Sequence, residues 1–150
     1  MTEPPAALIR ECLEQLRFAD RVLGGAVSRL SKVAQDARRR GGGTYSQARR
    51  YSAVDGIPAI ESAESEVWRA WSEACQALAG MGEATPPEPA EVRWHRRRLA
   101  RLWALFTWGS EATRLLDGAR DLRRHVREAF GRVKERHPEA TEDVPALGRA

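Results

Sequence analysis

Apolar residues recur every three or four positions along the first forty residues of the chain. The repeating positions are Ile9, Cys12, Leu16, Ala19, Leu23, Ala26, Leu30, Val33 and Ala37. This spacing places them on one helix face and predicts a helix over residues 5–39. We call this apolar face the seam. We expect it to pack against other helices of the same chain in an antiparallel bundle or, alternatively, against a second copy in a coiled coil.

A second apolar stripe predicts a second long helix over residues 58–80. Its members are Ile60, Ala63, Val67, Trp71, Ala74 and Leu78. Between the two stripes, glycines 41–43 end the first helix. Thr44 and Gln47 resemble a capping box, which predicts a short helix over residues 45–54.

Two further helices are expected after the proline-rich connector 82–89, over residues 88–108 and 110–136. The apolar positions after Gly109 would point about 180° away from those before it on a straight helix. We therefore expect a break or kink at Gly109–Ser110, with Ser110 as the N-cap; the alternative is one long helix whose halves contact different neighbours. Residues 138–150 are polar and predict a frayed, flexible tail after a single domain of residues 1–137. The predicted class is an all-α antiparallel bundle of four main helices.

The predicted helix over residues 88–108 has apolar side chains on two opposite faces. One face carries Val92, His95, Leu99, Leu102, Trp103 and Phe106, and the other carries Trp94, Arg98, Arg101, Leu105 and Trp108. We expect the first face to be core and Trp94, Leu105 and Trp108 to form a partner interface. The chain's own last helix, a second copy or a different partner would cover it.

Charge alternates along the chain, which is basic overall, at +4. The net charge is +5 over residues 1–54, −5 over 55–85, +6 over 86–137 and −2 over 138–150. Nearly all basic residues are arginines, whose planar guanidinium binds phosphate and stacks on rings. The other interpretation is that the arginines mainly form ion pairs inside a bundle, with Glu61, Glu66 and Glu73 as partners.

Excess arginine beside aromatic residues predicts binding to RNA or single-stranded DNA. The candidate nucleic-acid-binding residues are Arg38, Arg39, Arg40, Arg49, Arg50, Arg93, Arg97, Arg98, Arg101, Arg120, Arg124 and Arg127. We expect a non-enzymatic accessory subunit that binds nucleic acid or joins a nucleoprotein assembly. The alternative is a protein–protein scaffold or a homo-oligomeric bundle.

One short motif suggests an enzyme instead. Arg120-Asp-Leu-Arg-Arg-His125 resembles the Arg-x4-His motif of the HEPN family of helical ribonucleases. The resemblance implies that Arg120 stabilises the RNA phosphate and that His125 assists proton transfer. Arg132 and His137 repeat the same spacing.

The remaining chemistry is sparse. The three histidines and two cysteines lack the spacing of a metal site, and no phosphate-binding or nucleotide fingerprint occurs, so we expect no metal and no cofactor. Cys12 and Cys75 fit as reduced, small apolar residues. No segment reaches the roughly 20 apolar residues of a membrane span, and the start of the chain does not resemble a signal peptide. We expect a cytoplasmic protein without membrane contact.

Overall fold

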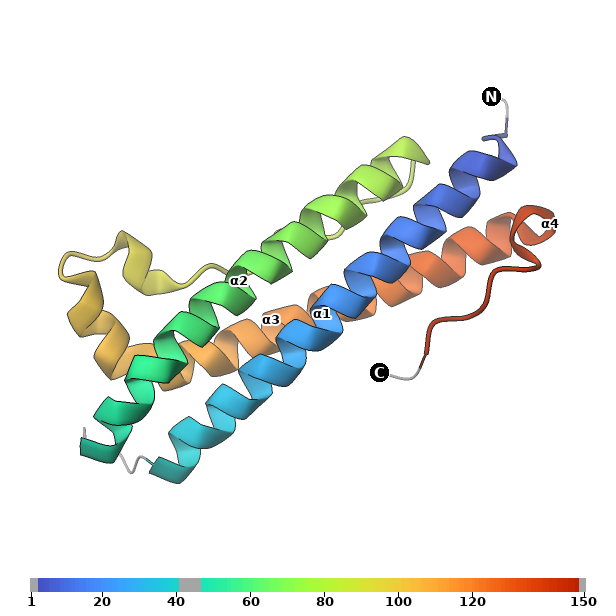
Figure 1. Cartoon of the computed structure of the whole chain (residues 1–150). Helices are drawn as coiled ribbons and strands as arrows, with labels where there is room; N and C mark the ends of the chain where they lie inside the picture. Colours follow the sequence, from blue (N-terminus) through green and yellow to red (C-terminus); the bar gives the residue numbers. More distant parts are fainter. Residues whose placement is uncertain (1–2, 41–46, 149–150) are drawn as a thin grey trace.

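The computed structural model describes residues 3–40 and 47–148 and places three long helices side by side (Figure 1). The helices are α1 (Ala6–Arg40), α2 (Gln47–Gly80), α3 (Ala100–Arg136) and the short α4 (Pro138–Thr141), with one 3₁₀ helix, η1 (Arg93–Arg96). The described part of the chain contains no strand. The prediction of an all-α bundle is confirmed.

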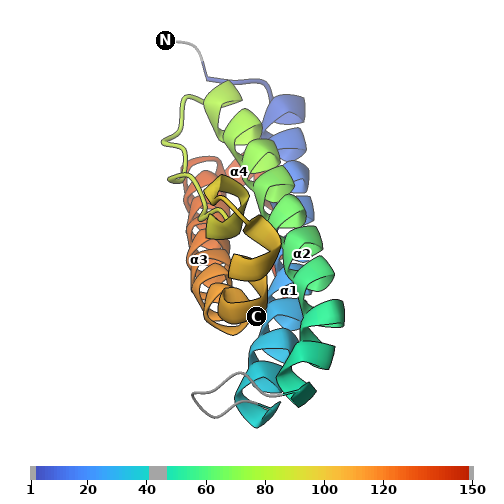
Figure 2. The same cartoon turned by 90° about the vertical axis from the view of Figure 1, so that its left-hand side faces the viewer.

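Helix α1 packs extensively against both other long helices, whereas α2 and α3 contact each other less. Helix α2 runs antiparallel to α1, and α3 also runs antiparallel to α1, in the same direction as α2 (Figures 1 and 2). Residues 81–99 connect α2 to α3 and contain no regular structure except η1. They carry the chain back along α2, so that α3 can begin near the start of α2. Two helices that follow each other in the sequence, α2 and α3, therefore run in parallel.

The predicted seam of α1 is the centre of the core. All nine of its positions are buried, and Leu13 and Ala34 join them. Alanines at 19, 26 and 37 let the neighbouring helices approach closely. On α3 the stripe from Ala112 to Val133 is buried as predicted. The hydrophobic period of three and four was a sufficient signal for these helices because each buries a single face.

The prediction of two helices between residues 45 and 80 is wrong, because α2 is continuous from Gln47 to Gly80 and contains Pro58. Proline lacks an N–H, so the carbonyl of Val54 has no helical donor four residues later. Packing favours continuity at this point: the ring of Trp108 lies against Gly56, and a Cβ at Gly56 would come within 3.0 Å of it. Contact with α3 thus holds α2 straight through a residue that ends most helices.

The predicted break at Gly109–Ser110 is also wrong, since α3 is continuous through it. The Ser110 hydroxyl is not an N-cap; it donates to the Thr107 carbonyl at 3.0 Å inside the helix. The chain instead changes course at Leu99, the residue before α3, which has a left-handed backbone with φ of 61°. Of the predicted helix over residues 88–108, the part before Leu99 contains only η1.

Candidate docking site

The segment before η1 is fixed to α2 by two tryptophans. The indole N–H of Trp71 donates to the Pro86 carbonyl at 3.0 Å, and that of Trp68 donates to the Ala90 carbonyl at 3.3 Å. The two rings also meet edge to face, with centroids 5.4 Å apart. These contacts satisfy backbone carbonyls of a segment that has no regular structure of its own.

Two carboxylates then fix the start of η1. Glu64 of α2 accepts the Val92 N–H, and Glu111 of α3 accepts the Arg93 N–H at 3.0 Å. Burial alone would raise the pKa of Glu111, but hydrogen bonds from Arg114 and from the Arg93 N–H, with the charges of both arginines, hold it below its ordinary value. The segment is thereby held to both helices, and its own side chains Val92 and Trp94 are buried.

Leu99 joins η1 to α3 in a conformation that is costly for a residue with a Cβ. Its φ of 61° lies in the left-handed region, and its side chain is 70% exposed. Such backbone strain costs on the order of 1–3 kcal/mol and is frequent at binding sites. No burial of the leucine side chain compensates for this cost.

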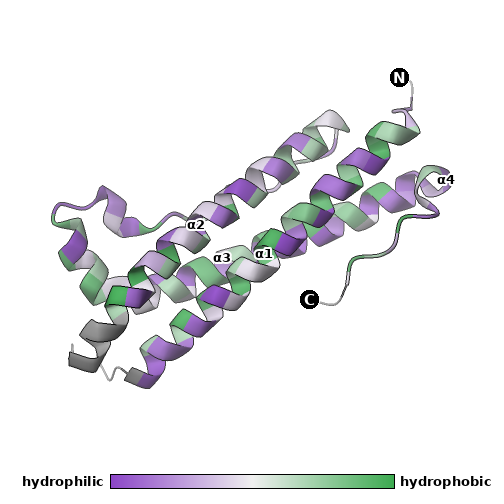
Figure 3. Cartoon of the chain, in the orientation of Figure 1, coloured by the Kyte–Doolittle hydropathy of each residue, from purple (hydrophilic) through white to green (hydrophobic). Residues whose placement is uncertain are grey.

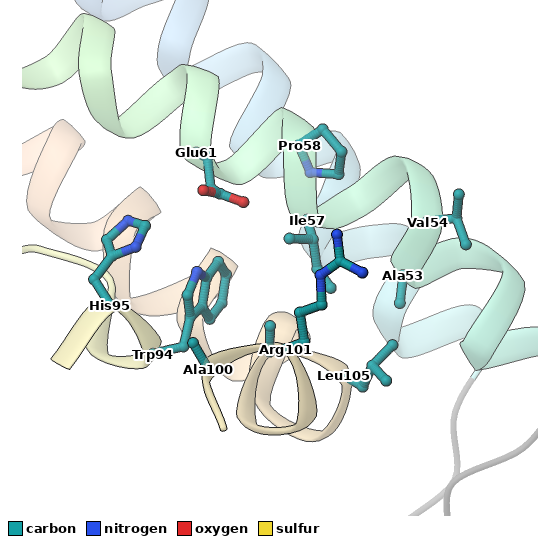
Figure 4. Close-up of a pocket in the computed structure, with 11 residues that line it drawn as sticks. Ala53, Val54, Ile57, Pro58, Glu61, Trp94, His95, Ala100, Arg101 and Leu105 are labelled. Atoms are coloured by element: carbon teal, nitrogen blue, oxygen red, sulfur yellow. The ribbon is translucent and has the colours of Figure 1, made fainter. Parts of the chain in front are cut away.

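A groove opens between α2 and the first turns of α3 (Figure 4). It has a volume of about 610 Å³, within the range of ligand-sized pockets. Its described walls are mostly apolar and consist of Ala53, Val54, Ile57, Pro58 and Glu61 of α2, Trp94 and His95 of η1, and Ala100, Arg101, Ala104 and Leu105 of α3. Two helices form its long walls, and η1 closes one end.

Exposed apolar side chains also lie on the outer face of the same turns of α3, opposite the residues that line the groove. Leu102 is 49% exposed, Trp103 45% and Phe106 54%, and Figure 3 shows hydrophobic residues on these first turns. With Leu99 they present an apolar area on the order of 500 Å², as large as the biggest patch of a typical monomer. We call the groove and these four residues the docking end.

Arginines border the docking end. The Arg97 guanidinium lies 5.2 Å from the centre of the Trp103 ring. Arg96 pairs with Glu91 at 2.7 Å, whereas Arg98 and Arg101 form no ion pair with any described residue. The docking end therefore combines apolar surface with excess positive charge.

The predicted interface residues Trp94, Leu105 and Trp108 lie elsewhere than expected. Trp94 is 3% and Trp108 0% exposed, so the expectation of an external interface at these tryptophans is wrong, and α2 and α3 of the same chain bury them. The prediction assumed one helix through both tryptophans. Because α3 begins only after Leu99, Trp94 lies in η1 and does not share the helical spacing of α3. Leu105 is half-buried and lines the groove.

The predicted nucleic-acid-binding arginines are scattered over the surface. Arg38 and Arg39 are exposed near the end of α1, while the side chains of Arg40, Arg49 and Arg50 lie outside the described residues. Of the other predicted residues, Arg93 lies 3.9 Å from Glu111, Arg124 pairs with Asp121, and Arg127 pairs with Asp20 at 2.8 Å. Of the predicted residues that the structure describes, Arg93 and Arg97 lie beside the exposed Trp103 ring, and Arg101 lines the groove.

Arg120 and His125, the HEPN-like pair, share α3 but not a face. Five residues along a helix separate two side chains by about 140° around its axis. His125 lies 3.6 Å from Asp121, and Arg120 is exposed and forms no ion pair with a described residue. The described geometry of one chain does not join the two side chains into one site.

Comparisons of the chain with protein-family models, with curated proteins and with solved structures find no match. Among the described residues, no three His, Cys, Asp or Glu side chains are grouped so that they could hold a metal ion. None of the described helices combines the length and apolar character that crossing a bilayer requires.

Sequence reasoning missed Leu99, Leu102, Trp103 and Phe106 as surface residues, although it identified both faces of this region. The signal was present further along the chain. Continuing the buried stripe of residues 112–133 backwards at helical spacing reaches Trp108 and Ala104, and leaves the other face outside.

Proposed function

We propose that this protein is a non-catalytic assembly subunit that binds a protein partner through its docking end. The observation that carries the proposal is the row of four exposed apolar side chains on the outer face of the first turns of α3, next to arginines, with an apolar groove on the other side of the same turns. Contiguous apolar surface of this size on a small bundle is typical of a protein interface. The strained Leu99, which holds an apolar side chain out in solvent, is consistent with a binding role.

The partner that this surface fits is an amphipathic helix with acidic residues beside its apolar face. The exposed face of α3 carries its apolar side chains at helical spacing, and a partner helix can pack its own apolar face against Leu99, Leu102 and Trp103. Arg98 and Arg101 have no carboxylate partner among the described residues, so acidic residues of the partner would supply one. A second copy related by a two-fold axis would instead place these arginines opposite their equivalents.

Nucleic-acid binding at the same end is the second candidate function. It is favoured by the Arg97 guanidinium over the exposed Trp103 ring, because arginines neutralise phosphates while aromatic rings stack on unpaired bases. The aliphatic groove walls favour the protein partner. Salt separates the two, since phosphate contacts weaken steeply as salt rises from about 50 to 200 mM.

The test uses synthetic amphipathic helices with leucines on one face and either glutamates or lysines on the other. The Glu peptide should bind the whole chain at least about tenfold more tightly than the Lys peptide, by fluorescence anisotropy at moderate salt. A Leu102→Ser/Trp103→Ser variant should lose most of this binding and keep its helicity. Leu8→Ser, an exposed apolar change at the start of α1, is the control.

Three results would contradict the proposal. Equal binding of both peptides would show that charge plays no part, and undiminished binding by the double variant would place the contact elsewhere. Tighter, salt-sensitive binding of an oligothymidylate would favour the second candidate. Sedimentation of the chain alone at rising concentration detects self-association through this end, which Leu102→Ser/Trp103→Ser should abolish.

A further inference from the structure

The chain after α4 turns back from the end of the bundle (Figure 1). Val144 and Leu147 pack half-buried against the core. Thr141 is buried, and its hydroxyl donates to the His137 carbonyl at 2.7 Å, which fixes the point where the segment leaves α4. We call residues 142–148 the tail, and the surface of α1 and α3 on which they lie the tail groove.

Basic side chains from both helices hold this segment by its backbone. Arg17 donates to the Pro145 carbonyl, Lys134 to that of Val144 at 2.6 Å and Arg127 to that of Gly148 at 2.5 Å, while Arg10 donates to the carbonyl of Ala140 in α4 at 3.1 Å. Amide carbonyls are neutral, so they leave the charges of Arg17 and Lys134 uncompensated, whereas Arg127 also pairs with Asp20 at 2.8 Å. Only Arg10 also reaches a carboxylate in the tail, that of Asp143 at 3.2 Å.

The charge balance of the tail groove is strongly positive without the tail. Its basic side chains are Arg10, Arg17, Arg21, Arg123, Arg127 and Lys134, against the carboxylates of Glu14 and Asp20. Buried Asp20 accepts from Arg123 at 3.0 Å and Arg127 at 2.8 Å. Arg21 forms no ion pair with any described residue.

Unfilled space adjoins the tail on the α1 side. A cavity of about 500 Å³ is lined by Arg10, Glu14, Arg17, Phe18 and Arg21 of α1 and by Asp143, Val144 and Pro145 of the tail. The tail therefore occupies only part of the tail groove, and three arginines border the part that remains.

We propose that the tail groove binds an extended acidic segment of a protein partner, and that the tail is a tethered occupant which competes with it. The tail groove already accommodates an extended chain, with Val144 and Leu147 against the core. A carboxylate acceptor adds Coulomb attraction that a neutral carbonyl cannot offer to an arginine or lysine donor. A segment with more carboxylates than the tail would therefore be held better, whereas a nucleic-acid strand offers no aliphatic side chains to replace these two.

This surface is separate from the docking end, and the inference does not depend on the proposed function. The tail keeps its place because tethering gives it an effective concentration in the millimolar range. Even weak contacts then suffice to occupy the tail groove. A partner has to exceed that local competition, so removal of the tail should raise its apparent affinity.

The experiment compares the whole chain with a variant that ends at Thr141. The probe is a fluorescein-labelled synthetic peptide of residues 142–148, used with its own sequence and with Ala146→Glu and Gly148→Glu. The shortened chain should bind the acidic peptide at least about tenfold more tightly than the whole chain does, and more tightly than it binds the unchanged peptide. Arg10→Gln/Arg17→Gln in the shortened chain should remove most of this binding, and Arg132→Gln, an exposed arginine of α3, should not.

Equal affinity of the shortened and whole chains for the acidic peptide, or an unaffected double variant, would overturn the inference. An oligothymidylate that binds the shortened chain more tightly than the acidic peptide would overturn the class of partner. If the shortened chain loses its helicity, Val144→Ser/Leu147→Ser in the whole chain loosens the tail instead, and the same rise in peptide affinity is expected. Leu102→Ser/Trp103→Ser should leave every one of these affinities unchanged.

Discussion

The first turns of α3 and the rest of the helix differ in where their apolar side chains lie. From Gly109 onwards, apolar side chains lie on the inner face and the outer face is charged, with Asp117, Arg120 and Asp121 all exposed. In the first turns, Ala104 and Trp108 continue the inner face, while Leu102, Trp103 and Phe106 are exposed on the outer one. The same helix is thus an ordinary bundle helix along one half and two-sided along the other.

This difference separates residues that hold the fold together from residues that are available for binding. Trp108 and Trp103 are of the same type, five positions apart, yet one is 0% and the other 45% exposed. Burial of a tryptophan stabilises the fold by several kcal/mol. An exposed tryptophan gives the fold little, so its presence among other exposed apolar side chains is better explained by a partner.

The largest expected effect follows from that pair of tryptophans. Trp108→Ala should lower the free energy of unfolding by about 3–5 kcal/mol, because it leaves a cavity against Gly56. Trp103→Ala should change it by at most about 1 kcal/mol and affect only binding. Urea unfolding followed by circular dichroism measures both; similar losses from the two changes would show that the halves of α3 do not differ.

A smaller loss of stability is expected at Glu111, the carboxylate of α3 that accepts the Arg93 N–H of η1. Glu111→Gln should cost about 1–3 kcal/mol near neutral pH, because the N–H of Arg93 and the guanidinium of Arg114 lose a charged acceptor. The folded pKa of Glu111 lies below its ordinary value of 4.5. Its contribution to stability is therefore fully present above that ordinary value and is lost as pH falls through the folded pKa.

Urea unfolding of both proteins at a series of pH values checks this sign. The difference between wild type and Glu111→Gln should be constant at neutral pH and shrink on acidification. Glu91→Gln is the matched control, since its exposed pair with Arg96 should contribute at most about 1 kcal/mol. A difference that grows in acid would contradict the assigned direction of the pKa.

Periodicity was enough to predict the helices that bury one face, and it failed where tertiary contacts override local signals. The seam of α1 and the stripe of residues 112–133 follow directly from their spacing of three and four. Pro58 and Gly109 look like helix ends, but packing across α2 and α3 carries both helices through them. Leu99 carries no local signal of its left-handed backbone, since glycine or asparagine normally occupies that region.

The docking end was only partly predictable for the same reason. Its two apolar faces are visible in the sequence, but which of them is buried depends on where α3 begins. The tail groove was missed, although Arg10, Arg17 and Arg21 are spaced seven and four residues apart on one face of α1. That spacing could have indicated it. The backbone carbonyls that these side chains bind become visible only in the folded chain.

The smallest expected effect on stability is at Leu99, where folding and binding should respond in opposite directions. Leu99→Gly removes the penalty of the left-handed backbone but frees the unfolded chain, so stability should stay level or rise by about 1 kcal/mol. Leu99→Ala keeps the Cβ and its strain, and should not gain. Both remove a side chain that is 70% exposed at the docking end, so both should weaken binding of the acidic amphipathic peptide to a similar extent. Thermal melts together with fluorescence anisotropy measure the two responses. If Leu99→Gly binds as the wild type does, Leu99 is merely a tolerated strain at the start of α3, and the docking end is confined to the groove and to the outer face of the helix.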